Sequence, residues 1–489
     1  MKIRLIEPGN LPYRKSFKNL YLYDKYIRTP SNGLLTLTTI VKHYVSDTLM
    51  YSESISEIVW KDVLDADIIF ISIFTFNAVR GYELADEIRK RSRALIVFGG
   101  LHATLNYMET CRHGDYVLLG EGDASIIQFI QAVQTNKPID FPGVAYYRDE
   151  QLIHTGSPKI PEQIETIPNR FLLYNFKKMA GHNTIWPQVH ASRGCPHQCD
   201  YCALVAAFGR KLRHRAPETI IEDIRQAIRF FENGHHRLTK ILWLTDDNFF
   251  ADRDWAIRVL NALIDSKISY NFTIQARYEV GLDDEMLELL KRAGFVELAV
   301  GIEFIEDEAF EIYHKKSTRD DIRRSIKNIQ AHGLRVRGLF IVGAENHTKG
   351  IGRRLADFVI ENKLCGVLIQ SMYFIPGTPV YETYQARLLD LDWSRCVGKV
   401  VHYPKNISPH DLQKEIILAS RRIYSIKRLF EAITTKRGNE RLLFIGEYLW
   451  QKNVRNNLMR DLPYLKKISE IALPGACPEG VGEHIAREF

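Results

Sequence analysis

Short apolar runs alternate with amphipathic stretches through the first 137 residues of the chain. The runs fit buried strands at Ile3–Ile6, Ile68–Ile73, Leu95–Phe98 and Tyr116–Leu119, and the amphipathic stretches fit helices at Leu34–Tyr44, Gly81–Arg91 and Ala124–Val133. Strands that alternate with helices predict a parallel, doubly wound sheet. Such sheets bind ligands in a crevice beyond the carboxyl ends of their strands.

These strand ends carry small or polar residues. One strand ends at Ser72, the next runs into Gly99-Gly100, and the last is followed by Gly120-Glu121-Gly122. Glycine lets a backbone approach a ligand closely, although tight strand-to-helix turns use the same residue. Three such ends in one sheet favour a ligand over three unrelated turns. A G-x-G-x-x-G motif followed by an acidic residue is missing, so a dinucleotide is not favoured.

A second alternation of strands and helices runs from about residue 183 to 385. Six strands are predicted at Gln188–Ala191, Ile241–Thr245, Phe272–Gln275, Glu297–Gly301, Val336–Val342 and Val367–Met372. Amphipathic helices separate them and end near glycines, as helix termini often do. The pattern predicts a partial parallel (β/α)6 barrel, with its chemistry at the carboxyl ends of the strands. Residues 138–182, which include five prolines, fit a connector with a hairpin, and residues 386–489 fit a mainly helical tail.

Composition narrows the class of protein. The 489 residues are 45% hydrophobic and 26% charged, which is typical of globular chains. The net charge of +7 is spread out without a long basic tail, so nucleic-acid binding is not expected. No apolar run approaches the roughly 18 residues of a membrane span. The first residues lack a secretory apolar core, and seven cysteines are too few for a disulfide framework, so we expect a cytoplasmic protein.

Three of the seven cysteines lie within eight residues, directly after the first barrel strand. Cys195, Cys199 and Cys202 have the spacing C-x3-C-x2-C. Three thiolates on one loop can hold three corners of a cubane iron–sulfur cluster and leave the fourth iron open. A zinc site with His197 as fourth ligand is an alternative, although zinc usually uses paired C-x-x-C elements.

The C-x3-C-x-aromatic-C motif after the first strand of a six-strand partial barrel resembles the radical S-adenosylmethionine (SAM) superfamily. The resemblance implies that the three cysteines bind a [4Fe-4S] cluster and that Tyr201 leans toward the adenine of SAM. In that family the open iron chelates SAM, and one electron cleaves SAM to a 5′-deoxyadenosyl radical. We therefore expect an external electron donor such as flavodoxin or ferredoxin.

Other positions match that family in the same order. Asp246 and Asp247 follow the second barrel strand, where members contact the SAM amino group, although a helix-capping turn would use the same residues. Glu303 ends the fourth strand, where a carboxylate reaches the ribose hydroxyls. Gly343 lies in a stretch that resembles the glycine-rich strand beside the adenine. Arg277 on the third strand fits a ligand contact or a structural salt bridge, and no catalytic acid or base can be chosen.

The N-terminal domain resembles the cobalamin-binding domain of one branch of this superfamily, the class B radical SAM methyltransferases. Ser72, Gly99-Gly100 and Gly120-Glu121-Gly122 carry the resemblance, which implies that cobalamin lies between this sheet and the barrel mouth. The D-x-H-x-x-G motif that supplies a lower cobalt ligand in many cobalamin enzymes is missing, as is common in this branch. His102 matches no ligand motif and fits a helix-start or surface histidine.

The sequence thus predicts four regions and one favoured function. The regions are a cobalamin-binding-like domain (1–137), a connector (138–182), a radical SAM barrel (183–385) and a helical tail (386–489). The favoured function is methylation of an unactivated carbon of a small molecule, natural-product or lipid intermediate. Alternatives are a cobalamin-linked rearrangement or cyclisation, a domain that no longer binds cobalamin, and a non-enzymatic redox or cobalamin sensor. Sulfur insertion needs a second cysteine triad, and the N-terminal domain contains only Cys111.

Overall fold

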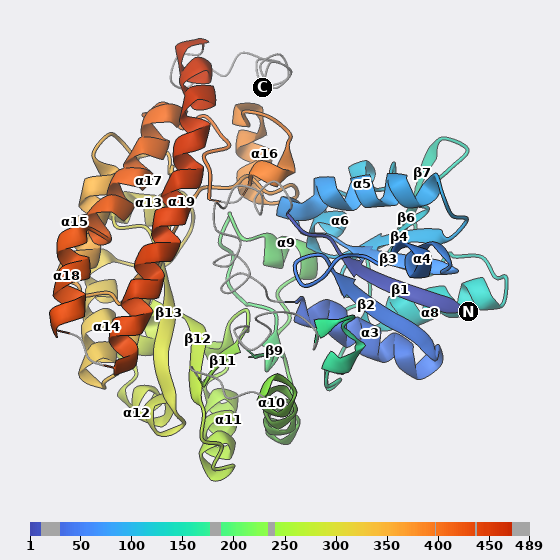
Figure 1. Ribbon diagram of the computed structural model, residues 1–489, viewed down its shortest axis with the longest axis horizontal. Coiled ribbons are helices and arrows are strands. Elements are labelled where there is room, and N and C mark those ends of the chain that lie inside the picture. Colours follow the sequence, from blue (N-terminus) through green and yellow to red (C-terminus); the bar gives the residue numbers. More distant parts are fainter. Residues whose placement is uncertain (11–29, 177–186, 233–239, 397, 436–437, 472–489) are drawn as a thin grey trace.

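The structure is a computed structural model that describes residues 1–10, 30–176, 187–232, 240–396, 398–435 and 438–471. Two α/β units stand side by side, the N-terminal unit in blue and cyan and the barrel in green to yellow (Figure 1). The helices α17 (Pro409–Ile423), α18 (Ile426–Thr435) and α19 (Gly438–Ile471) lie against the barrel on the side away from the N-terminal unit, whereas the orange helix α16 (Pro379–Tyr384) lies near that unit. The predicted α/β class with a helical C-terminal region is confirmed.

The N-terminal sheet has seven strands in the order β2-β1-β3-β4-β5-β6-β7. The strands are β1 (Lys2–Glu7), β2 (Asp47–Ser52), β3 (Ile68–Ser72), β4 (Leu95–Gly99), β5 (Tyr116–Leu118), β6 (Val144–Arg148) and β7 (Gln151–His154). The first five are parallel. The hairpin β6–β7 adds antiparallel to β5, so the hairpin predicted within the connector extends this sheet.

Helices cover both faces of this sheet, because each parallel connection must cross over one face. The helices are α3 (Asn32–Tyr44), α4 (Trp60–Leu64), α5 (Ala78–Arg89), α6 (Leu101–Leu105), α7 (Tyr107–Thr110) and α8 (Gly122–Gln134). Leucine and isoleucine side chains of α3 and α8 pack on one face, and those of α5 pack on the other. This is the doubly wound arrangement that the periodicity predicts.

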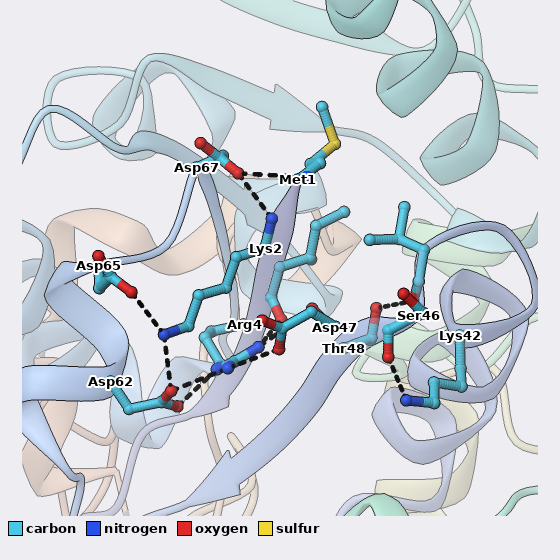
Figure 2. Close-up of polar contacts among 12 residues, drawn as sticks. Met1, Lys2, Arg4, Lys42, Ser46, Asp47, Thr48, Asp62, Asp65 and Asp67 are labelled. Atoms are coloured by element: carbon cyan, nitrogen blue, oxygen red, sulfur yellow. Dashed lines mark hydrogen bonds and ion pairs between the residues drawn. The ribbon is translucent and has the colours of Figure 1, made fainter.

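Strand β2 lies at the sheet edge and was not predicted, because its sequence Asp-Thr-Leu-Met-Tyr-Ser has only a short apolar centre. A buried arginine anchors it. Arg4 on β1 pairs with Asp62 of α4 (2.5 Å) and with Asp47 at the start of β2 (2.8 Å), as Figure 2 shows. One guanidinium therefore joins two strands and a helix.

The second sheet has six parallel strands in the sequential order β15-β14-β13-β12-β11-β8. They are β8 (Gln188–Val189), β11 (Ile241–Leu244), β12 (Asn271–Arg277), β13 (Phe295–Glu303), β14 (Arg335–Val342) and β15 (Gly366–Ser371). A short antiparallel pair, β9 (Ser192–Arg193) and β10 (Arg213–His214), follows β8. The order and direction are those of the predicted open (β/α)6 barrel.

The barrel helices pack outside the strands and share one apolar core with them. They are α10 (Pro217–Glu232), α11 (Arg253–Asp265), α12 (Asp284–Arg292), α13 (Asp307–Ile312), α14 (Arg319–Ala331) and α15 (Ile351–Glu361). The short helix α9 (Ala203–Phe208) follows the three cysteines and contacts α6 of the N-terminal unit. The C-terminal region adds α16 (Pro379–Tyr384), α17 (Pro409–Ile423), α18 (Ile426–Thr435) and α19 (Gly438–Ile471). Among the described residues, no helix is both long and apolar enough to cross a bilayer.

Apolar contacts join the two units on both sides of the N-terminal sheet. Phe230 and Phe231 of α10 belong to the core beneath α3. Trp393, in the short 3-10 helix η8 (Trp393–Arg395), is 3% exposed and belongs to the core on the α5 side. The units therefore meet through buried aromatic side chains as well as through polar groups.

Candidate functional site

The cysteine loop leaves β9 at the carboxyl end of the barrel. Gly194 opens the loop with a φ of +93°, and a Cβ there would clash with the carbonyl of Lys211. Cys202 donates its backbone N–H to the carbonyl of Cys199 (3.0 Å), and α9 begins at the next residue. All three thiols of the motif are free and half-buried. A glycine and a turn thus hold three available thiols on one short loop.

Two aspartates after β11 bind the backbone that leads into this loop. Asp246, 2% exposed, accepts from the backbone N–H of Ala191 (2.6 Å) and Ser192 (3.2 Å) and from the Ser192 hydroxyl (3.1 Å). Asp247 accepts from the backbone N–H of Gly194 (2.8 Å). Burial raises the pKa of Asp246 to about 7, and these donors act in the opposite direction. The contacts assign both carboxylates to positioning the loop, and the contact with SAM predicted for them stays a prediction.

Glu303 ends β13 in an unusual backbone conformation. Its φ is +67°, and the pairing with β14 shifts register between Gly301 and Glu303. Lys315, which is 5% exposed, donates to the Gly301 carbonyl (2.7 Å) and lies 3.4 Å from the Glu303 carboxylate. Left-handed backbone in a non-glycine residue stores strain and is concentrated at functional sites. Nothing in the sequence around Lys315 marks it as part of this site.

Aromatic and cationic groups surround the cysteine loop. The Tyr201 ring packs edge-on against Phe304, with ring centroids 6.1 Å apart, and burial raises its pKa well above the usual value. Arg277 forms the predicted salt bridge, with Glu279 (2.7 Å), and the negative charge of a Cys199 thiolate also raises its pKa. Positive charge beside three thiols suits an anionic iron–sulfur cluster, so these residues fit the group that the motif implies.

The zinc alternative finds no support in the geometry. Across the described ranges, no three histidine, cysteine or acidic side chains are arranged to hold a single metal ion. His197 therefore does not complete a tetrahedral set with the three cysteines. A cubane cluster spreads its ligands over several irons, so its thiols need not converge on one point.

Two buried histidines fix the turn at Gly343, which has a φ of +92°. His347 accepts at Nδ1 from the backbone N–H of Gly343 (3.0 Å) and Ala344 (3.2 Å), and His402 donates from Nε2 to the Gly343 carbonyl (3.2 Å). Burial lowers the pKa of His347 to about 3 and that of His402 to about 4. Sequence reasoning missed both, because histidines far apart in the chain carry no pattern.

At the carboxyl edge of the N-terminal sheet, some of the predicted cobalamin contacts have open space beside them and others are packed against protein. Ser72 and Gly99 are half-buried, and a Cβ on Gly99 would meet only the Leu118 carbonyl at 3.7 Å. At the other three glycines, neighbouring protein atoms already fill the space beside the Cα. A Cβ on Gly100 would lie 2.8 Å from the Ile73 carbonyl oxygen. A Cβ on Gly120 would lie 2.7 Å from Pro158, and one on Gly122 would lie 3.1 Å from Leu37. Ser72 and Gly99 therefore fit the edge of a bound cobalamin best.

Glu121 joins this edge to the base of the cysteine loop. Its carboxylate pairs with Arg193 (2.7 Å), two residues before Cys195, and with the buried Arg213 of β10. Asp123, at the start of α8, also pairs with Arg193 (2.8 Å). The sequence contains these arginines without any sign of their partners, because the acidic residues lie about 70 to 90 positions earlier.

His102 occupies the first turn of α6, as predicted, but it is not on the surface. Its side chain is fully buried, with Nδ1 3.2 Å from the Thr75 hydroxyl and Nε2 3.9 Å from Glu109. The indole N–H of Trp393 donates to the same Glu109 carboxylate (3.2 Å). Trp393 packs against His102 and helps to bury it, and the sequence around His102 gives no sign of this contact.

The profile of the Radical SAM superfamily matches residues 189–359, which contain the cysteine loop and most of the barrel. Residues 189–359 form a radical SAM domain. The predicted radical SAM enzyme is thereby confirmed.

Known proteins are similar to this chain over a longer stretch than the radical SAM domain alone. The chain is 21% identical to a bacteriochlorophyllide d C-12(1)-methyltransferase of Chlorobaculum tepidum, over 84% of this chain and 86% of that protein. It is structurally similar to the radical SAM methyltransferase TsrM from Kitasatospora setae (TM-score 0.62, 15% identity, 78% and 77% of the two chains). It is also similar to the cobalamin-dependent radical SAM enzyme OxsB (TM-score 0.69, 13% identity, 100% and 74%). The chain therefore resembles cobalamin-binding radical SAM enzymes over both α/β units.

Proposed function

We propose that the protein is a cobalamin-dependent radical SAM methyltransferase that methylates an unactivated carbon of a small molecule. The Arg193 bridge carries the proposal. Its side chain binds Glu121 and Asp123 at the carboxyl edge of the N-terminal sheet, and its backbone leads directly into the cysteine loop. The edge that would hold a corrin and the loop that would hold a cluster are thus fixed to each other.

Such proximity matters because two reactive cofactors must serve one substrate, and the protein supplies their positions. When bound, the [4Fe-4S] cluster with SAM supplies a 5′-deoxyadenosyl radical and cobalamin supplies a methyl group. Cys195, Cys199 and Cys202 would hold the cluster, and Ser72 and Gly99 would lie against cobalamin.

Three further groups would bind SAM. Tyr201 presents an aromatic ring beside the cysteine loop, and Gly343 presents backbone at the end of β14. Glu303 presents a carboxylate that lies 3.4 Å from the Lys315 amine. The electron comes from an external protein donor, and the substrate is a small molecule. The names of the relatives support methyl transfer, and the solved structures with cobalamin bound support the second cofactor.

Anaerobic reconstitution with iron, sulfide and hydroxocobalamin, followed by gel filtration, tests the proposal. We expect about four irons and one cobalt per chain, the content of one cubane and one corrin. Cys199→Ala is the matched control: it should lose iron and all deoxyadenosine formation but keep its cobalt. Iron without cobalt in the wild type would contradict the cobalamin assignment. Deoxyadenosine formed with a cyclised or rearranged product, and no methylated one, would contradict methyl transfer.

A further inference from the structure

Asn248 follows the two aspartates that hold the cysteine loop, and its own side chain reaches the first cysteine. Asp246 and Asp247 accept hydrogen bonds from the backbone that enters the loop. Asn248 donates from Nδ2 to the Sγ of Cys195, at a distance of 3.7 Å. Three consecutive residues after β11 therefore hold the entrance of the loop and contact one of the proposed cluster ligands.

The Asn248 amide makes this contact in place of the one that its position favours. Asn248 lies immediately before the short 3-10 helix η5 (Phe249–Ala251). An asparagine at such a position commonly accepts from a backbone N–H of the helix that follows. Within the described ranges, the Asn248 side chain forms no capping bond of this kind. The residue is 7% exposed, so its amide is largely removed from water and needs a partner in the protein.

A buried donor at this position affects the charge that the Cys195 sulfur can carry. An iron–sulfur cluster is held by thiolate sulfurs, and hydrogen bonds to those sulfurs help to set its reduction potential. Reduction adds one negative charge, so a donor stabilises the reduced form more than the oxidised form. Asn248 is neutral, unlike Arg277, whose positive charge lies near Cys199. The effect of this hydrogen bond can therefore be measured without a change in net charge.

We propose that Asn248 raises the reduction potential of the [4Fe-4S] cluster through its hydrogen bond to Cys195. The inference rests on the proposed cluster, but it is independent of cobalamin and of methyl transfer. The external donor supplies the one electron that takes the cluster from its oxidised to its reduced form. With the Asn248 N–H in place, a donor of given potential reduces a larger fraction of the clusters. Asn248 acts through Cys195 and is therefore a positioning residue.

A redox titration followed by electron paramagnetic resonance tests the proposal. The full-length protein is reconstituted with iron and sulfide alone, so that the signal comes from the cluster. Asn248→Leu keeps a branched side chain but removes the N–H donor, and it should retain about four irons because the two aspartates still hold the loop. At a fixed potential, its ratio of reduced to oxidised cluster should fall about tenfold, which is about 59 mV for a one-electron couple.

Asn362→Leu is the matched control. Asn362 lies at the end of α15, at the amino end of the barrel strands, and its amide donates to the Phe358 carbonyl (2.8 Å). Its iron content and reduced fraction should equal those of the wild type. Asn248→Asp is a second variant in case the leucine variant does not fold. At alkaline pH its ionised carboxylate has no proton to donate, so its reduced fraction should fall as well.

Three outcomes would overturn the proposal. One is a ratio in both Asn248 variants that stays within about threefold of the wild-type ratio, or that rises. Another is a loss of iron with an unchanged potential in the clusters that remain, because Asn248 would then only hold the loop. The third is a wild-type protein that takes up no cluster, which would contradict the proposed function as well. The iron content of the wild type distinguishes this last failure from the other two.

Discussion

Removing the Asp246 carboxylate should release the cysteine loop. In Asp246→Ala, the backbone N–H groups of Ala191 and Ser192 lose their acceptor inside the protein. A buried donor left without a partner costs about 1–3 kcal/mol, so the two cost about 2–6 kcal/mol. At about 1.4 kcal/mol per tenfold, the fraction of chains with a correctly held loop falls about 30-fold at the lower limit. Ala191 and Ser192 lie directly before the cysteine loop, so we expect the loss of these hydrogen bonds to reduce cluster binding before it affects other properties.

Asp246→Asn is the matched control. Its amide oxygen can accept from the same two N–H groups, and its amide nitrogen can donate to the Ser192 hydroxyl. We therefore expect Asp246→Asn to take up about four irons on reconstitution, while Asp246→Ala takes up a small fraction of that. Iron and sulfide content, visible absorption and deoxyadenosine formation measure the difference.

Two results would refute this reasoning. If Asp246→Ala binds its cluster and cleaves SAM like the wild type, the three hydrogen bonds do not hold the loop. If Asp246→Asn binds the cluster but shows a strongly raised KM for SAM, the carboxylate contacts SAM directly, as the sequence resemblance implies.

Three more perturbations separate the parts of the site. In Gly99→Leu the protein has room for the new Cβ, but the rest of the leucine side chain occupies the carboxyl edge of the N-terminal sheet, where cobalamin is proposed to bind. Cobalt uptake should therefore fall while about four irons remain. Unchanged cobalt uptake would contradict the placement of cobalamin against Gly99. Glu121→Gln leaves the buried Arg213 without its counter-charge and should cost about 3 kcal/mol in denaturant unfolding; a loss below 1 kcal/mol would contradict the bridge. His347 has a folded pKa of about 3, below its usual 6.5, so the unfolded chain binds the extra proton and stability falls as pH drops through 6.5. In His347→Gln the pH dependence should be shallower by about 1.4 kcal/mol per pH unit below 6.5, measured as the difference from wild type.

The sequence predicts the two sheets because local periodicity determines which segments become strands and helices. The six barrel strands and their order follow from apolar runs separated by amphipathic stretches, and the cysteine loop follows from spacing alone. Strand β2 escapes prediction because an edge strand needs fewer apolar residues. Its anchor, the Arg4 contact with Asp62 and Asp47, depends on residues about 45 to 60 positions apart.

Site contacts between distant residues were harder to predict. Glu121 is predicted beside cobalamin, which stays a prediction, and the structure shows in addition that it pairs with Arg193 and Arg213. Gly120 is predicted to approach a ligand, which also stays a prediction, and Pro158 packs against it. A glycine or a carboxylate has the same local sequence whether its partner is a ligand or another part of the chain. Only the tertiary structure distinguishes the two.

The buried Trp393 has a consequence for the order in which the chain can fold during synthesis. The indole belongs to the core on the α5 side of the N-terminal sheet and binds Glu109 there, yet it is made more than 280 residues after that glutamate. While the ribosome is still producing the barrel, the first unit has an unfilled hydrophobic site. A fragment that stops at residue 137 would keep this defect permanently. The first unit to emerge is therefore among the last to be completed, because its core includes a side chain that follows the barrel in the sequence.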